Sequence, residues 1–452
     1  MPITLGPMPA LRRRLDTDDR EILRLAVPAF FALVAEPLFL LADTAIVGHL
    51  GTNPLAGLAI AGTVVQTLVY LAVFLAYGTT AAVGRHLGAG DLRGALATGI
   101  SGIWLALLIG AVLTLVVAVG AGTIVGWFDA DPAVNDQAVD YLRIAAFGIP
   151  PMLVVLAGTG ILRGLQDTRT PLVIAVAANL ANIGLNFAFV YGLDLGISGS
   201  ALGTTVAQLG AGLALAAIVV RGARRHGAAL RPDRGGIAEV ARANVPLFVR
   251  TATLRAALLL ATLVASTMAA SSIAAYQIVW TITITLALAL DAIAIAGQAM
   301  TGRYLGAGDV ESTRRTTRRM MAWGLWFGIV VGGLLLVTSP WLPRAFSSDP
   351  DVWHAALGGL IVLALTQPTS GVAFVLDGVL IGAGDGTYLA WAGVVTLAVY
   401  APLAGLVWAL DLGLTSLWIA YSVFLFARTA TLVHRERSDA WLVTGVPARS
   451  RA

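Results

Sequence analysis

Six charged side chains lie within stretches of the sequence that are otherwise apolar. They are Glu36, Asp43, Arg250, Arg255, Asp291 and Asp377. A charge near the centre of a bilayer costs about 2.5–3.5 kcal/mol on insertion scales, so such residues usually face a cavity or an opposite charge. A carboxyl group in this position can carry a proton or bind a cation, and an arginine can neutralise it.

Two of the acids share one segment, with a proline between them. Glu36 and Asp43 are seven residues apart, which places both on one face of a helix, and Pro37 removes a backbone donor and favours a bend. A later segment carries three asparagines with helical spacing: Asn179, Asn182 and Asn186. A carboxylate helix and an asparagine helix in one bundle can form a pocket for a proton or a cation. The alternative is a hydrogen-bonded helix contact with no role in transport.

The second half of the chain has its own acids and arginines. Asp291 lies in the middle of an apolar segment, and Asp377 lies toward the cytoplasmic end of another. Either Arg250 or Arg255 could neutralise one of these carboxylates. The alternatives are therefore a fixed structural ion pair and, for an unpaired acid, a proton carrier.

The sequence repeats itself with a shift of 218 positions. The segment Gly84–Asp91 (GRHLGAGD) corresponds to Gly302–Asp309 (GRYLGAGD), and shared prolines and glycines follow the same shift. The buried charges do not, because Asp43 corresponds to Ala261. A duplicated apolar unit predicts a transporter of two similar lobes, whose polar interiors have different tasks.

The composition is that of a membrane protein. Of 452 residues, 58% are hydrophobic and only 12% are charged, about half the charged fraction of soluble domains. There is no cysteine, which excludes disulfides and thiolate metal sites. The histidines lack the spacing of metal ligands, and we find no serine nucleophile elbow, so we expect neither a metal site nor an enzyme. The arginines lie beside apolar segments, so a nucleic-acid partner is not expected.

Apolar segments long enough to cross about 30 Å of hydrocarbon occur twelve times. They are 22–48, 54–82, 94–120, 138–161, 171–192, 198–220, 240–268, 272–300, 318–340, 354–381, 387–409 and 413–433. Because each repeat has an even number of spans, the sequence predicts an all-α integral membrane protein with two parallel six-helix repeats. The predicted parts are an N-terminal segment 1–21, a lobe 22–220, a polar linker 221–239, a second lobe 240–433 and a tail 434–452.

The loops indicate the orientation. With the N-terminus inside, the inner segments hold most arginines, among them Arg85, Arg163 and Arg303, and the tail adds Arg428; the outer loops hold only Arg143 and Arg344. This asymmetry follows the positive-inside rule. We therefore expect a multi-pass protein of the plasma membrane (the inner membrane, where there are two) with both termini in the cytoplasm.

The sequence resembles the multidrug and toxic compound extrusion (MATE) family, in its DinF-type branch, from about residue 20 to 433. Four segments carry the resemblance: Pro37–Gly51 (PLFLLADTAIVGHLG), Leu162–Pro171 (LRGLQDTRTP), Leu290–Gln298 (LDAIAIAGQ) and Leu376–Asp385 (LDGVLIGAGD). The resemblance implies a V-shaped pair of lobes that exports organic, often cationic, compounds in exchange for H⁺ or Na⁺.

The resemblance also implies roles for individual residues. Asp43 matches the cation-coupling aspartate of the family, and Asp377 matches an aspartate implicated in cation binding in some relatives. The polar group around the first would be Tyr141, Thr159, Asn182, Asn186 and Thr204. Several relatives have a carboxylate where this chain has Asn186, a loss that weakens a sodium site. Glu36 supplies a second carboxylate, though in a different place.

We therefore expect a monomeric secondary active exporter of a small organic molecule, with H⁺ as the coupling ion and no cofactor. Protonation of Asp43 from outside would repack its helix and displace a substrate held between the lobes. The alternatives are a Na⁺-coupled drug antiporter and a flippase for lipid-linked precursors, which would have additional spans and a more cationic central cavity. A channel fits unequal lobes and buried acids less well.

Overall fold

The computed structural model describes residues 17–446, and this part of the chain is built from helices. The first half contains α1 (Thr17–Gly48), α2 (Thr52–Leu71), α3 (Phe74–Gly88), α4 (Leu92–Gly126), α5 (Pro132–Ala145), α6 (Ile149–Gly164), α7 (Arg169–Phe187) and α8 (Gly196–Arg225). The second half contains α9 (Arg234–Ser266), α10 (Ala270–Gly306), α11 (Val310–Thr338), α12 (Pro350–Gly382), α13 (Gly386–Ala409) and α14 (Gly413–Arg437). Short 3-10 segments lie at Ala146–Gly148, Leu342–Ala345 and Asp439–Trp441, and a π-helical segment lies at Ala188–Gly192.

Twelve segments within the described residues are long and apolar enough to cross a membrane, which confirms the predicted all-α membrane fold. The span Thr52–Gly88 comprises α2 and α3, and the span Pro132–Gly164 comprises α5 and α6. Their counterparts in the second half, α10 and α12, are continuous helices. The two halves therefore repeat the order of spans but differ in where a span is interrupted.

The polar connection between the halves is shorter than the predicted linker 221–239. Helix α8 continues to Arg225, and α9 already begins at Arg234 because the Asp233 carboxylate accepts hydrogen bonds from the backbone N–H groups of Gly235 and Gly236. Polar residues at a helix end remain helical when they are capped. The predicted segments 1–21 and 434–452 lie partly outside the described residues, and α1 and α14 extend into both.

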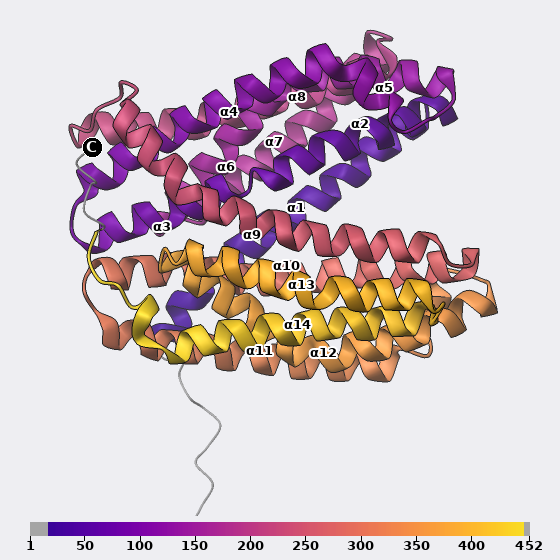
Figure 1. The fold of residues 1–452 in the computed structure, drawn as a ribbon. Helices are drawn as coiled ribbons and strands as arrows, with labels where there is room; N and C mark the ends of the chain where they lie inside the picture. Colours follow the sequence, from indigo (N-terminus) through magenta and orange to yellow (C-terminus); the bar gives the residue numbers. More distant parts are fainter. Residues whose placement is uncertain (1–16, 447–452) are drawn as a thin grey trace, which may run out of the picture.

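Each half packs around apolar cores of its own, and the two lobes lie one above the other in Figure 1. We call the end of the molecule that carries residues 226–233 the linker end, and the opposite end the far end. The ribbons of the lobes separate toward the far end, at the right of Figure 1. Helix α3 of the first lobe packs on α10 of the second at the linker end.

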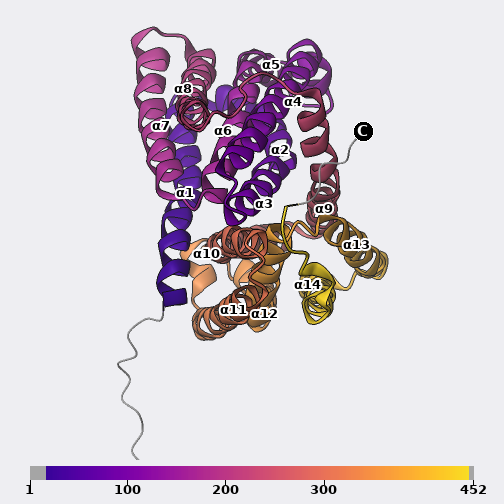
Figure 2. The same ribbon diagram turned by 90° about the vertical axis from the view of Figure 1, so that its left-hand side faces the viewer.

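The first helix of each half starts on the opposite lobe. Ile22, Leu25 and Ala26 near the start of α1 belong to an apolar core of the second lobe, together with residues of α10 and α12. The rest of α1 runs beside α7, and Figure 2 shows the helix passing from one lobe to the other. In the counterpart helix α9, Val240 belongs to the core of the first lobe. Movement of the lobes relative to each other must therefore involve α1 and α9.

The α3–α10 contact is made by the two copies of the repeated motif. A methyl group added at Gly88 would collide with the carbonyl group of Arg303, and one added at Gly306 would collide with the carbonyl group of Arg85. In each copy of the motif two glycines are four residues apart, Gly84 and Gly88 on α3 and Gly302 and Gly306 on α10. This spacing of small residues lets helix backbones approach this closely. The repeated sequence thus places equivalent glycines of the two lobes against each other.

Polar contacts join the lobes at the same end. The Arg85 guanidinium of α3 donates hydrogen bonds to the carbonyl oxygens of Val443 (2.8 Å) and Gly445 (2.9 Å), and also to that of Ala383. Its counterpart Arg303 pairs with Glu21 of α1 at 2.7 Å. These contacts tie the first lobe to the C-terminal segment and α1 to the second lobe.

Candidate functional site

Asp43 lies in the far half of α1 and is only 4% exposed. Its Oδ1 atom accepts two hydrogen bonds, from Asn186 Nδ2 of α7 (2.7 Å) and from Ser200 Oγ of α8 (2.7 Å). No arginine, lysine or histidine forms an ion pair with Asp43 in the described range. The carboxylate is thus held by neutral donors from two other helices.

The hydrogen-bond network continues away from the carboxylate. Asn186 Nδ2 also donates to Asn182 Oδ1 (3.0 Å), and Asn182 Nδ2 donates to Thr204 Oγ1 (2.9 Å). Residues 182 and 186 are one turn apart on α7, and 200 and 204 are one turn apart on α8, so each helix presents one polar edge to the site. Tyr141, 5% exposed, lies beside Asp43 and the two hydroxyl groups.

The Asn186 side chain is confined as well as hydrogen-bonded. Asn186 is fully buried, and its Oδ1 atom has no hydrogen-bond partner among residues 17–446. A methyl group added at Gly203 of α8 would collide with this oxygen, so the glycine makes the space that the amide occupies. The amide orientation aims its NH₂ group at Asp43 and Asn182.

Helix α7 is also hydrogen-bonded to the backbone of α1 on both sides of Asp43. Asn179 Nδ2 donates to the carbonyl oxygen of Ala35 (3.0 Å), and the Tyr191 hydroxyl donates to that of Ile46 (2.7 Å). Tyr191 is placed by the π-helical segment that ends α7. The asparagine stripe predicted from the sequence therefore faces α1 along its length.

The structure brings together Asp43, Asn182, Asn186 and Thr204, with Tyr141 next to them. Ser200 was missed, although its spacing of four residues from Thr204 on one helix was a usable signal. Two other expected members lie apart from this network in the described structure. Glu36 is exposed on α1, and Thr159 is half-buried on α6; neither has a hydrogen bond to the group.

A second polar site lies mainly in the other lobe and centres on Asp377 of α12, which is 6% exposed. Arg250 of α9 holds both carboxylate oxygens, through Nε (3.3 Å) and Nη2. Arg428 of α14 pairs with Oδ1 at 3.3 Å. Counting Arg428 with the cytoplasmic tail was wrong, because its side chain is 11% exposed and α14 continues for more than two turns beyond it.

Two further charged residues, Asp291 and Arg163, lie near this pair. Asp291 of α10, half-buried, is within electrostatic reach of Arg250, Arg428 and Asp377, and also of Arg163. Arg163 was assigned to a cytoplasmic loop, but it lies in the last turn of α6 and faces the same cluster from the first lobe. Of the two candidate arginine partners, Arg250 forms the ion pair.

Arg255 does not pair with a carboxylate in the described structure. Its guanidinium lies over the ring of Tyr70 of α2, 5.3 Å from the centroid, and its Nε is buried without a hydrogen-bond partner. Arg250 lies similarly over Tyr77 of α3, at 5.5 Å. Both contacts join the second lobe to the first by cation–π attraction.

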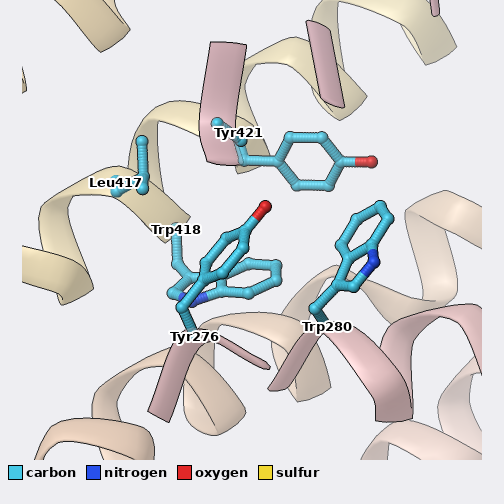
Figure 3. A pocket seen from close by; sticks show the side chains of 6 residues that line it. Tyr276, Trp280, Leu417, Trp418 and Tyr421 are labelled. Atoms are coloured by element: carbon cyan, nitrogen blue, oxygen red, sulfur yellow. The ribbon is translucent and has the colours of Figure 1, made fainter. Parts of the chain in front are cut away.

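Aromatic residues line a small pocket between α10 and α14, nearer the far end. Figure 3 shows the rings of Tyr276, Trp280, Trp418 and Tyr421 around a common space, and Ala261 and Leu417 complete the lining. Tyr276 and Trp280 lie nearly parallel, with centroids 6.3 Å apart and planes at 7°. The pocket offers flat apolar surface rather than charge.

Comparison with known proteins gives a consistent result. The family model MatE matches residues 28–188 and, 218 positions later, residues 246–406. The chain is 30% identical to the protein DETOXIFICATION 44, chloroplastic, of Arabidopsis thaliana, covering 90% of this chain and 80% of the relative. It is 28% identical to the DNA damage-inducible protein F of Escherichia coli, covering 92% of each. A crystal structure of MATE in the bent conformation has the same fold, with a TM-score of 0.86 at 21% identity, covering 93% of this chain and 95% of that chain.

Proposed function

This chain belongs to the MatE family of multidrug and toxic compound extrusion transporters, and from that premise we propose that it exports a small organic compound in exchange for H⁺. It is a multi-pass membrane transporter and not an enzyme. The observation that supports the coupling site best is the burial of Asp43 without a cationic partner in the part of the chain that the structure describes. Such an acid is expensive in a membrane unless ions bind to it and leave.

The donors around Asp43 support H⁺ rather than Na⁺. Sodium is a hard cation that binds oxygen ligands, whereas Asn186 turns its NH₂ group and Ser200 its hydroxyl group toward the carboxylate. Both hydrogen bonds end on Oδ1, which leaves Oδ2 as the oxygen that takes up a proton. A second carboxylate at position 186 would favour the metal ion, and this chain has an amide there.

Protonation at Asp43 would act on α1. The two hydrogen bonds to Oδ1 are charge-assisted while the carboxylate is ionised, and they weaken when it is neutral. The start of α1 is packed on the second lobe, and further along α7 is hydrogen-bonded to Ala35 and Asp43 of α1; Pro28 lies before these two bonds and Pro37 lies between them. We infer that loss of the charge lets α1 bend between the prolines, and that this couples the proton to movement of the lobes.

We place the linker end in the cytoplasm, and the protein in the plasma membrane as a monomer. Basic side chains gather at that end, with Arg85, Arg303 and Arg319 among them. The positive-inside rule supports this orientation. The contact of the lobes at the linker end then supports an outward-facing arrangement.

The proposal is tested in proteoliposomes with two probes that share one ring system, naphthoate and naphthylmethyl-trimethylammonium. Vesicles loaded with either probe are acidified outside, and efflux of each is measured for the wild type, Asp43→Asn and Asp377→Asn. Whichever probe the wild type exports, Asp43→Asn should lose its acceleration by the pH gradient. Unchanged acceleration would overturn the coupling role, and efflux driven by a Na⁺ gradient at clamped pH would favour the sodium alternative.

The lipid-linked precursor flippase remains the second candidate because of one observation. The arginine cluster between the lobes makes the centre of the molecule more cationic than the sequence indicated. A phosphate-bearing lipid would meet the same guanidinium groups. Movement of a fluorescent lipid-linked diphosphate across the vesicle bilayer, without efflux of either naphthyl probe, would establish this function instead.

A further inference from the structure

The cluster between the lobes contains more arginines than acids. Arg163, Arg250 and Arg428 surround Asp291 and Asp377, and Arg255 lies five residues after Arg250 on α9, over the ring of Tyr70. We propose that this cluster binds the anionic group of the exported substrate, and that the flat apolar part of the same molecule lies against the aromatic pocket in Figure 3. The inference rests on the proposed function in taking the occupant of this site to be the transported molecule.

The arginines have more hydrogen-bond donors than the neighbouring acids engage. Asp377 is already held by Arg250 through two nitrogens, so Arg428, at 3.3 Å, is a second cation on the same carboxylate. Arg163 has no hydrogen bond or ion pair with any of residues 17–446. A guanidinium carries five N–H donors and matches a carboxylate or phosphate in a paired geometry. Donors therefore remain for an anion that enters between the lobes.

The charged and aromatic parts lie along the same two helices, where Trp280 and Tyr421 are half-buried while Tyr276 and Trp418 are buried. On α10, Tyr276, Trp280 and Asp291 are separated by four and eleven residues, which keeps them on one side of the helix. On α14, Tyr421 precedes Arg428 by two turns, or about 10 Å of helix rise. A molecule with a planar ring and an acidic group about that far apart can contact both parts at once.

The same charge balance disfavours an organic cation at this site. A cation seated between Arg163 and Arg428 would meet an excess of positive charge in an environment of low dielectric, where repulsion is strong. The carboxylate of the first lobe does not compensate for this positive charge, because Asp43 is 4% exposed and hydrogen-bonded to Asn186 and Ser200. The structure thus favours a substrate of the opposite charge from the one that the family resemblance implied.

The test is direct binding to the purified full-length protein in nanodiscs of phosphatidylcholine, with empty nanodiscs as the blank. Naphthoate and naphthylmethyl-trimethylammonium are titrated by calorimetry without any ion gradient. We expect naphthoate to bind at least about tenfold more tightly than the cation, and Arg163→Gln and Arg428→Gln each to weaken naphthoate binding about tenfold. Trp280→Ala should weaken both probes alike, since it removes ring contact but no charge.

Two controls keep the outcomes separate. Arg93→Gln removes an exposed arginine at the start of α4 and should leave naphthoate binding unchanged. The second control is the choice of assay: Asp43→Asn tests the coupling proposal in the efflux assay, and the arginine variants test this one in binding without a gradient, so failure of either proposal gives a different result. Equal binding of the two probes, or naphthoate binding that survives both arginine substitutions in folded protein, would overturn the proposal.

Discussion

Asn186 donates one amide proton to Asp43 at 2.7 Å and the other to Asn182 at 3.0 Å, so a single side chain joins the acid of α1 to the polar edge of α7. The remaining atom of this amide, Oδ1, is buried without a partner in the described structure. An amide in this place donates to the acid and carries no charge. This arrangement supports the proposed proton site, because a metal cation would recruit oxygens from both residues.

Replacing this amide by an acid should change the coupling ion. In Asn186→Asp, two carboxylates face each other and one of the two donors to Asp43 is lost, so we expect efflux driven by a Na⁺ gradient to appear at clamped pH. Proteoliposome efflux with and without Na⁺ measures the effect. Asn179→Asp, which adds an acid to the same helix away from Asp43, is the control; Na⁺ dependence in both variants, or in neither, would contradict the prediction.

Gly203 should be essential for the site although it makes no polar contact. Gly203→Ala introduces a methyl group that collides with Asn186 Oδ1 and displaces the amide from Asp43, so we expect proton-driven efflux to fall by about tenfold or more. Gly210→Ala lies on the same helix with open space around it and should transport like the wild type. Equal activity of the two variants would show that the amide tolerates displacement.

The glycine contact between the lobes should contribute to the free energy of unfolding. Gly88→Ala pushes a methyl group into the backbone carbonyl of Arg303, and we expect a loss of about 1–3 kcal/mol in the free energy of unfolding. Thermal unfolding of the purified protein in detergent measures this. Gly62→Ala in α2 meets no neighbour and should be neutral or slightly stabilising, because alanine favours a helix. An unfolding midpoint of Gly88→Ala at or above that of Gly62→Ala is incompatible with the contact.

The Arg250–Asp377 pair should behave as a buried ion pair. Asp377→Asn leaves two arginines without their carboxylate, and we expect a cost of about 3–5 kcal/mol. The double variant Arg250→Gln/Asp377→Asn should recover part of that loss, because one uncompensated charge has been removed together with the acid. Chemical unfolding of the two single variants and the double variant closes the cycle; additive losses would mean that the residues do not interact.

The fold was predictable from hydropathy because a span that crosses a bilayer must be long and continuously apolar. The predicted span 387–409 and helix α13, Gly386–Ala409, differ by one residue. Helix ends that carry polar residues were harder to predict from the sequence, because α8 and α14 continue as capped or solvated helices after their apolar stretch ends. Hydropathy therefore indicates which part of a helix lies in lipid, but it does not indicate the residue at which the helix ends.

The same limit explains which site residues were found. Asp43 and Asn186 could be predicted because helical spacing and a family resemblance indicated the same residues. Arg163 and Arg428 were missed because each lies close to the end of a span in the sequence, where hydropathy does not distinguish a loop residue from a residue in the last turns of a helix. Only the packing of α6 on α10, and of α14 on α12, shows that these two arginines lie near a carboxylate.

The contact of α3 with α10 also bears on how a chain of this kind arose. Equivalent positions make reciprocal contacts there, Gly88 against Arg303 and Gly306 against Arg85, which is the pattern of an isologous interface between two identical subunits. A half-length ancestor with one copy of the motif would present this surface to a second copy of itself. Fusion of two such genes would preserve the pairing and free each half to change its interior, so that one could keep an acid and the other could gather arginines.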